Sequence, residues 1–382
     1  MKKILIFSLA YYPHVGGAEV AIKEVTDRIK DFEWHIITLR FGDEPHEEKI
    51  GNVYVHRTGS GSSYFSKIIF VLQAVKRAIV LHREHHFGAM WAMMSYMLLP
   101  IVILRMEGIS LPYVLTLQEG DTYEHMFSRL RIIPFLPLLS AGFRKATVVQ
   151  TISTYLGKWA RRRGFSGPLE IIPNGVDVKH FTGEPISHAG IVLITTSRLV
   201  NKNAIDDVIK ALPLLPPSVR FKILGVGPDE AIIKELAWKN NVSNRVEFLG
   251  HINHSEMPHY LHASDIFIRP SRSEGMGNSF IEAMAAGIPV IATQEGGIAD
   301  FLFDPDKNKD KEPTGLAVPV NSPAEIARQV KRLMEDNILR GRIIKNAKEL
   351  VFAKYDWNLI SRDMKEKVFN VLFIDGHRIS VI

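Results

Sequence analysis

The sequence predicts two α/β domains, each built on a doubly wound parallel β-sheet. At 382 residues the chain is too long for one ordinary core and fits two domains of about 150–200 residues each. Short Val- and Ile-rich runs alternate with helical patterns in both halves, which is typical of parallel sheets covered by helices on both faces. A stretch containing Pro, Gly and Ser at residues 182–190 separates the two alternations and is typical of a linker.

The first domain is predicted to span residues 1–183. It begins with a buried strand at 3–9, and residues 18–30 have helical spacing. A basic amphipathic helix is expected around residues 65–83. The most apolar window, 90–104, is interrupted by a proline and is shorter than the roughly 20 residues that cross a bilayer, so it predicts a buried helix and strand. Further strands are expected at 34–39, 53–57, 112–117, 146–153 and 169–173.

The second domain is predicted to span residues 184–360, and the pattern from about residue 322 onwards is helical. In open parallel sheets, ligands bind outside the carboxyl ends of the strands. Because every candidate group below follows a predicted strand, we expect two facing domains to enclose a cleft between those ends. The strands of this domain are expected at 190–197, 220–225, 245–250, 265–270 and 288–293.

The composition is that of a soluble globular protein, with 46% hydrophobic and 23% charged residues. The absence of cysteine excludes disulfides and thiolate metal sites. The N-terminus has some likeness to a signal peptide, but its apolar run at 4–12 is short and leads into Pro-His-Val-Gly-Gly instead of a small-residue cleavage site. We interpret it as a first strand followed by a glycine turn, and expect a cytoplasmic protein.

The net charge of +6 is spread unevenly. Residues 125–169 contain eight basic side chains, no acidic one, and apolar runs between them. This combination suits peripheral contact with the inner face of an anionic membrane, although a solvated face over an ordinary core explains it as well. No nucleic-acid-binding motif accompanies the charge, so no nucleic-acid partner is expected, and the sequence does not indicate an oligomeric state. The basic residues are Arg129, Arg131, Arg144, Lys145, Lys158, Arg161, Arg162 and Arg163.

Two segments that follow predicted first strands have groups suited to anions. Gly16 and Gly17 let the backbone approach a ligand at a helix start, although a plain strand-to-helix turn would have the same sequence. The spacing is not G-x-G-x-x-G, which counts against a nicotinamide enzyme. Arg198 and Lys202 are four residues apart and could neutralise a pair of phosphates, or they could be exposed charges at a strand exit.

The most informative stretch is SRSEGMGNSFIEAMAAGIPVIAT at 271–293. Its glycines form a loop whose amides can face a ligand, and a helix predicted to begin near Ser279 presents its positive end to the same place. Glu274 can accept hydrogen bonds from sugar hydroxyls, and Glu282, in the first helical turn, can accept from a vicinal diol such as ribose. An alternative is that Ser279 and Glu282 form a capping box, S-x-x-E.

The whole pattern resembles the E-x7-E signature of the retaining, sugar-nucleotide-dependent glycosyltransferases of family 4, which have the two-Rossmann-domain GT-B fold. Further motifs of that family occur in its order over almost the full chain. The resemblance favours the ligand-binding interpretation of Glu282 over the capping box. The supporting motifs are PHVGGAE at 13–19, PNGVD at 173–177, SRLVNKN at 197–203, LGVGP at 224–228, FLGHI at 248–252 and GG at 296–297.

The resemblance implies transfer of a sugar from a nucleoside-diphosphate sugar to a glycan, lipid-linked or small-molecule acceptor, as in glycan or cell-envelope polysaccharide biosynthesis. It implies a donor site in the second domain, an acceptor site in the first, and no required metal or other cofactor. A closing segment, 361–382, would return to the first domain. In the donor site, the resemblance implies that Arg198 would hold the diphosphate and that Gly16 and Gly17 would close over it. Glu274 would bind the transferred sugar, Glu282 would bind the ribose, and the backbone of Leu249 and Gly250 would face the base. The sugar and phosphates would meet the amides of Gly275, Met276, Gly277, Asn278 and Ser279.

Two positions depart from the family pattern. Many members have a histidine where this chain has Gln118, which can donate a hydrogen bond to a sugar but cannot transfer a proton at neutral pH. His125, Glu119 or Asp121 could compensate. The usual lysine five residues after the arginine is replaced by Asn203, so Lys202 is the candidate phosphate ligand. Gln118 keeps a second interpretation open, a catalytically inactive GT-B-fold protein that binds sugar nucleotide or glycan.

Overall fold

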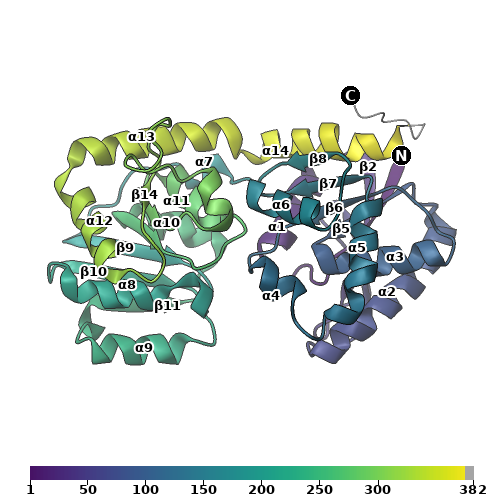
Figure 1. Cartoon of the computed structure of the whole chain (residues 1–382), viewed down its shortest axis with the longest axis horizontal. Coiled ribbons are helices and arrows are strands. Elements are labelled where there is room, and N and C mark those ends of the chain that lie inside the picture. The colour runs from purple at the N-terminus through teal and green to yellow at the C-terminus, as the bar shows by residue number, and fades with distance from the viewer. Residues whose placement is uncertain (375–382) are drawn as a thin grey trace. The chain divides into compact units, whose positions relative to one another are not determined.

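The computed structural model describes residues 1–374, and its chain divides into two compact units (Figure 1). Of the described residues, the first unit contains 1–119, 123–174 and 357–374, and the second contains 120–122 and 175–356. The division therefore falls at 174/175 instead of 183/184, and the last segment joins the first unit at Trp357 instead of residue 361. A bridge between Val176 and Asp356 places both crossing points side by side. Residues 375–382 of the predicted closing segment 361–382 lie outside the described residues.

The first unit is built on an eight-stranded sheet with the order β3-β4-β2-β1-β5-β6-β7-β8. All its neighbouring strands are parallel except the β3–β4 pair, an antiparallel edge that the sequence pattern did not reveal. The strands are β1 Lys2–Phe7, β2 Phe32–Leu39, β3 Glu47–Ile50, β4 Val53–Thr58, β5 Ala89–Met93, β6 Tyr113–Leu117, β7 Val148–Thr151 and β8 Leu169–Ile171.

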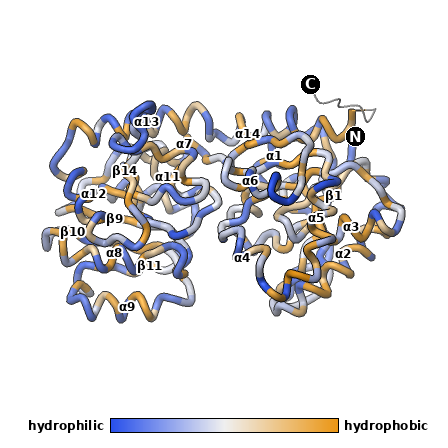
Figure 2. Tube along the Cα trace, in the orientation of Figure 1, coloured by the Kyte–Doolittle hydropathy of each residue, from blue (hydrophilic) through white to orange (hydrophobic). Residues whose placement is uncertain are grey.

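Both faces of this sheet are buried, as expected for parallel strands. One face, which includes Ile4 and Trp34, packs against α1 and against the C-terminal α14, whose Trp357 enters the same core cluster. Helix α3 packs against both α2 and α5, and α2 also contacts β2 and β4. Figure 2 shows α3 and α5 mostly in hydrophobic colours. The helices are α1 Gly17–Arg28, α2 Tyr64–His85, α3 Leu98–Met106, α4 Tyr123–Phe127, α5 Leu136–Lys145, α6 Thr154–Arg162 and α14 Trp357–Asp363, with shorter turns η1 Ser95–Met97, η2 Ile133–Phe135, η8 Met364–Phe369 and η9 Asn370–Phe373.

The second unit is built on a six-stranded parallel sheet with the order β11-β10-β9-β12-β13-β14. Its central strands β9 and β12 are adjacent, so the loops that follow them begin at the same edge of the sheet. The two predicted doubly wound parallel sheets are therefore confirmed. The strands are β9 Ile191–Thr196, β10 Val219–Leu224, β11 Val246–Gly250, β12 Ile266–Arg269, β13 Val290–Ala292 and β14 Leu316–Ala317.

The helices of the second unit cover a core of aliphatic side chains from β9, β10 and β12. In Figure 2 the outer helices α9 and α13 alternate between hydrophobic and hydrophilic colours, as expected for helices with one buried stripe. Among residues 1–374, no helix is both long and apolar enough to cross a membrane. The helices are α7 Val178–Phe181, α8 Ile205–Ala211, α9 Glu230–Lys239, α10 Met257–His262, α11 Asn278–Ala286, α12 Pro323–Glu335 and α13 Asn337–Lys354, with turns η3 Asn201–Asn203, η4 Leu212–Leu214, η5 Ser243–Arg245, η6 His254–Glu256 and η7 Gly296–Asp300.

Candidate active site

The carboxylate of Glu274 is held by a buried arginine at the end of β12. Arg269 NH2 donates to Glu274 Oε2 at 3.0 Å, and the two side chains are 6% and 14% exposed. Arg269 NH1 also donates to the carbonyl of Thr196 and to Ser279 Oγ, at 3.1 and 2.9 Å. Burial lowers the pKa of Arg269, and the charge of Glu274 opposes that shift. One guanidinium thus joins the end of β9, the loop and the start of α11.

The glycines of this loop allow close backbone approaches. Gly277 has φ +85°, and a Cβ there would lie 2.6 Å from Arg269 NH2. Gly296, with φ +62°, passes so near Glu274 that a Cβ would lie 1.9 Å from the Glu274 carbonyl oxygen. That carbonyl accepts a hydrogen bond from the amide of Gly297. Replacement of either glycine would therefore displace Glu274.

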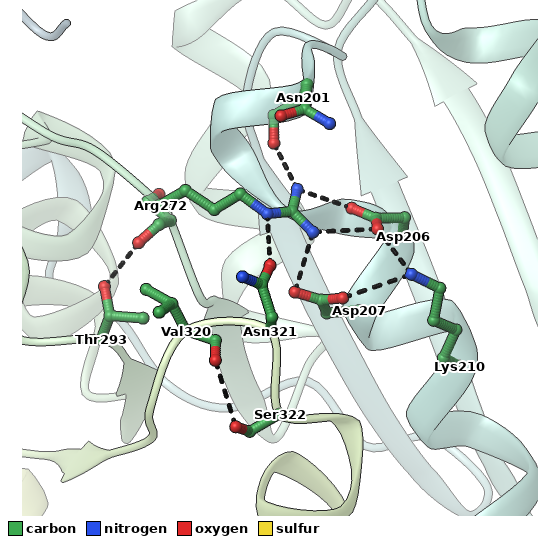
Figure 3. A network of polar contacts seen from close by, with 10 residues as sticks. Asn201, Asp206, Asp207, Lys210, Arg272, Thr293, Val320, Asn321 and Ser322 are labelled. Atoms are coloured by element: carbon green, nitrogen blue, oxygen red, sulfur yellow. Dashed lines mark hydrogen bonds and ion pairs between the residues drawn. The ribbon is translucent and has the colours of Figure 1, made fainter. Parts of the chain in front are cut away.

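A second arginine of the same loop, Arg272, anchors it to α8 (Figure 3). Its guanidinium donates to both carboxylate oxygens of Asp206 at 2.9 Å and to Asp207 Oδ2 at 3.0 Å. Its Nε donates to Asn321 Oδ1 at 2.7 Å. Burial acts to raise the pKa of Asp206, but hydrogen bonds from Arg272 and Lys210 outweigh it and leave that pKa below its usual value. The network fixes the loop that contains Glu274.

Arg198 follows β9 in a segment that lies against the LGVGP loop. The amide of Ser197 donates to Leu224, and the amide of Leu199 donates to Val226. A Cβ on Gly225 would lie 1.9 Å from the Ser197 carbonyl oxygen, so this close approach requires glycine. Asn203 is buried and donates to the Arg198 carbonyl at 2.6 Å. The backbone is held, while the Arg198 side chain is exposed and has no hydrogen bond or ion pair to any residue of 1–374.

Lys202 and Glu274 lie near the same residue, Gly120. A Cβ on Gly120 would be 3.0 Å from Lys202 Nζ and 3.6 Å from Glu274 Oε1. Lys202 Nζ forms a partly exposed ion pair with Asp121 at 3.2 Å. The Gly120 carbonyl accepts from Ser273 Oγ, which ties segment 120–122 to the same loop. The structure therefore brings Lys202 to the Glu274 loop.

Glu282 is not part of a helix cap. Helix α11 begins at Asn278 with Gly277 as its N-cap, so Glu282 is its fifth residue and the predicted place in the first turn is wrong. The capping-box alternative is also wrong, because the Ser279 hydroxyl accepts from Arg269. Glu282 is 15% exposed, and its Oε1 lies 3.1 Å from His254 Nε2. Leu249 and Gly250 end β11, where Gly250 has φ +69° and accepts from the Gly225 amide.

Two family models match consecutive parts of the chain. Glycosyltransferase Family 4 matches residues 15–180, and Glycosyl transferases group 1 matches residues 179–350. An uncharacterised glycosyltransferase of Methanocaldococcus jannaschii is 25% identical over 357 residues, which are 94% of this chain and 95% of that protein. The chain belongs to glycosyltransferase family 4. Its two units have the Rossmann-like architecture of the GT-B fold.

Two further proteins are similar to this glycosyltransferase. A GDP-mannose-dependent monoacylated alpha-(1-6)-phosphatidylinositol monomannoside mannosyltransferase of Corynebacterium glutamicum is 30% identical over 264 residues, 62% of this chain and 66% of that protein. Anabaena HepE, solved in complex with UDP and glucose, superposes with a TM-score of 0.76 at 22% identity, over 96% of this chain and 99% of that one.

The remaining predicted residues of the glycosyltransferase lie in the first unit. Gly16 and Gly17 are exposed at the start of α1, and the Gly16 amide donates to Glu19 Oε2 at 2.8 Å. Gln118 and Asn174 exchange two amide hydrogen bonds of 3.0 and 3.1 Å. Glu119 is 1% exposed and accepts from the Ser95 amide, and burial raises its pKa. Glu119 is therefore a buried carboxyl bonded to η1, and a role for it in place of the histidine stays a prediction.

The sequence analysis missed Arg269 and Arg272, although both stand beside Glu274 in the stretch RPSRSE. The sequence gives little indication that these two arginines are structural, since an arginine after a strand is usually exposed. Only the buried partners, Thr196 and Ser279 for Arg269 and the two aspartates for Arg272, show that these side chains hold the loop.

We predict that Arg272→Ala lowers the free energy of unfolding by about 2–3 kcal/mol, because it leaves the 3%-exposed Asp207 carboxylate without its arginine. Urea denaturation followed by circular dichroism measures this change. The matched control is Arg328→Ala, which removes a largely exposed pair with Glu325 and should change stability by about 0.5 kcal/mol or less. Equal losses in the two variants would contradict the assigned role of Arg272.

Proposed function

We propose that this glycosyltransferase transfers a sugar, with retention of anomeric configuration, from a nucleoside-diphosphate sugar bound by its second unit. The proposal rests on one observation: the arginines at the ends of β9 and β12 differ in whether a carboxylate compensates their charge. Arg269 and Arg272 are each bonded to carboxylates, while Arg198 is exposed and has no acidic partner among residues 1–374. A free guanidinium beside a glycine loop and a helix N-terminus suits a diphosphate. The Corynebacterium relative is named as GDP-mannose-dependent, and HepE was solved with UDP.

In the proposed reaction, Arg198 and Lys202 stabilise the charge that develops on the leaving diphosphate, together with amides at the start of α11. These groups can supply the positive charge for which other transferases use a metal ion. Glu274 accepts from a hydroxyl of the transferred sugar and stabilises positive charge at its anomeric carbon. Glu282 accepts from the ribose, and the backbone of Leu249 and Gly250 lies against the base. Gly16 and Gly17 of the first unit approach the diphosphate when donor binds.

The proposed retention is a same-face attack by the acceptor hydroxyl. A double displacement would need a carboxylate free to act as nucleophile. Glu274 accepts hydrogen bonds from Arg269 and from the Gly275 amide, a setting that holds a carboxylate for charge stabilisation instead of bond formation. Same-face attack by the acceptor hydroxyl needs no nucleophilic carboxylate.

The alternative is a catalytically inactive protein that binds sugar nucleotide or glycan. It is favoured by one observation, that Gln118 stands where many family members have histidine and uses its amide to hold Asn174. Incubation of the protein with a panel of nucleotide sugars, followed by NMR, distinguishes the two. Released nucleoside diphosphate with the sugar in its original anomeric form supports transfer with retention. An inverted product would overturn the retaining mechanism, and binding without any turnover of the donors, with or without acceptor, would favour the inactive protein.

We predict that Glu274→Gln lowers kcat by about a hundredfold or more and changes donor Kd little, because the contact strengthens as charge develops at the anomeric carbon. Steady-state kinetics and calorimetry with the active nucleotide sugar measure the two quantities. Glu295→Gln, at an exposed glutamate of the same unit, is the control and should retain full activity. Unchanged turnover in Glu274→Gln would remove Glu274 from the mechanism.

We predict that Glu282→Ala raises donor Kd about tenfold, because a carboxylate hydrogen bond to the ribose is lost. Its melting temperature should stay close to that of the wild type, since Glu282 caps no helix and its side chain pairs with the exposed ring of His254. Isothermal calorimetry and thermal denaturation measure the two effects, with the exposed Glu247→Ala as control. A stability loss with unchanged affinity would assign Glu282 a purely structural role.

For the acceptor, we propose a lipid-linked molecule with an anionic head group. The first unit contains an apolar pocket of about 400 Å³ between α2, α3 and segment 129–138. Leu72 and Met97 are among its apolar lining residues, and Arg129 and Arg131 also line it. Hydrocarbon would occupy the pocket while the two arginines bind the anionic head group. The acceptor in the name of the Corynebacterium relative is a phosphatidylinositol mannoside.

The arginines of the basic stretch 125–169 have different partners in the structure. The guanidinium of Arg131 lies over the ring of Tyr64, 4.6 Å from its centroid, at the pocket. At the end of α6, Arg161 bonds carbonyls of its own turn, and Arg162 lies over Tyr123. We therefore assign the proposed anionic contact to Arg129 and Arg131, and not to the whole stretch.

We predict that the double variant Arg129→Ala/Arg131→Ala raises KM for an anionic lipid acceptor about tenfold or more and leaves KM for the donor unchanged, because each basic residue contributes about 1 kcal/mol near an anionic surface. Binding to anionic liposomes should also weaken when salt is doubled. The control, Arg144→Ala/Lys145→Ala, removes the same charge at the exposed end of α5. Equal effects of the two double variants would contradict a specific site.

A further inference from the structure

A chain of carboxylates and imidazoles crosses the edge of the first sheet at β2, β3 and β4. Glu33 Oε1 lies 3.0 Å from His35 Nε2, and His35 Nδ1 lies 2.9 Å from His56 Nε2. His56 Nδ1 lies 2.6 Å from Glu47 Oε2. Glu33 and His35 are two residues apart on one strand and so share a face of the sheet. These side chains belong to the first unit, whereas the Glu274 loop belongs to the second.

The hydrogen bonds in this series of four side chains need one more proton than two neutral imidazoles provide. Three close contacts between acceptor-type atoms require three protons, whereas two neutral imidazoles supply only two. If His56 donates to Glu47 and His35 donates to His56, the lone pair of His35 Nε2 faces the Glu33 carboxylate. One further positive charge is needed between them.

The rings of His35 and His56 are almost fully buried, with residue exposures of 2% and 5%. Lys3 Nζ lies 3.0 Å from Glu33 Oε1, but this contact places no proton between that carboxylate and His35 Nε2. A metal cation between the carboxylate and the ring nitrogen fulfils the requirement while both rings remain neutral.

A third ligand is present at the same place. His85 is at the end of α2. One of its ring nitrogens and the ligand atoms of Glu33 and His35 all lie within 4.8 Å of one another. Its ring centroid is 4.4 Å from that of His35. Ligand atoms around tetrahedral Zn²⁺ are about 3.3 Å apart for bonds of about 2.0 Å, so a modest inward movement of the partly exposed His85 side chain would complete three bonds.

We propose that Glu33, His35 and His85 bind a Zn²⁺ ion. Two imidazoles and one carboxylate suit zinc better than magnesium or calcium, which prefer oxygen ligands. The contact of His35 Nδ1 with His56, which is bonded in turn to Glu47, is the outer partner that orients a metal-binding imidazole. Arg77 of α2 forms an ion pair with the same Glu47. The metal therefore ties the end of α2 to the edge of the sheet, and its role is structural and separate from sugar transfer.

The test uses the untagged full-length protein after treatment with EDTA. After incubation with ZnCl2 and gel filtration, the wild type should retain one equivalent of zinc by mass spectrometry, and excess ZnCl2 should raise its melting temperature by about 5 °C. Glu33→Gln and His85→Gln should each weaken zinc binding at least tenfold and abolish the thermal shift. Both positions are partly exposed, so these variants test the ligands without removing a buried ring.

The matched control is His86→Asn, which alters the exposed neighbouring histidine, whose φ of 53° asparagine tolerates. It should retain zinc as the wild type does. Absence of bound zinc in the wild type would overturn the proposal, and so would equal retention in Glu33→Gln and His85→Gln.

Discussion

The buried guanidinium of Arg269 is the interaction on which the geometry of the second unit's candidate site depends. A charge with 5% exposure is costly unless an opposite charge and hydrogen bonds compensate it, and removal of one partner is more costly still. Here the partners come from three places that are far apart in sequence: Thr196 at the end of β9, Glu274 in the loop and Ser279 in α11. The Phe280 ring lies 4.2 Å from the guanidinium and limits its movement further. The position of Glu274 is therefore determined by the need to compensate this charge.

The strand order of the sheet is consistent with the proposal that Arg198 and Glu274 belong to one site. Strands β9 and β12 are parallel neighbours, so their carboxyl ends emerge side by side at one edge. The loops that follow are then held by different means: a close backbone approach to Gly225 and Gly227 for the first, and arginine–carboxylate bonds for the second. Buried hydroxyls of Thr196 and Ser197 have no partner among the described residues, which indicates that this edge is shaped for more than its own stability.

The sequence predicted those parts of the structure that depend on local rules. Continuous Val and Ile runs located the long parallel strands, and glycine spacing located the loops at Gly225, Gly277 and Gly296. Two short strands, β3 and β14, were missed because four and two residues carry too little periodicity. The predicted start of α11 near Ser279 is within one residue of the observed start at Asn278, but the sequence did not reveal that the left-handed Gly277 is the N-cap. The pairing of Gln118 with Asn174 spans 56 residues and has no local signal.

The candidate site shows how ligand-binding cations can be separated from structural ones. Arg198, Arg269 and Arg272 lie at or just after the ends of strands of one sheet and carry the same charge, so the sequence alone does not distinguish them. The structure distinguishes them by whether a carboxylate compensates the positive charge. Arg269 is paired with Glu274, and Arg272 is paired with Asp206 and Asp207. Arg198, in contrast, has a fixed backbone and an exposed side chain. A rigid backbone beneath an uncompensated charge is the arrangement expected where an anion supplies the missing partner, because the protein then loses little conformational freedom on binding. That contrast, more than any single motif, is the reason for proposing Arg198 as the diphosphate ligand.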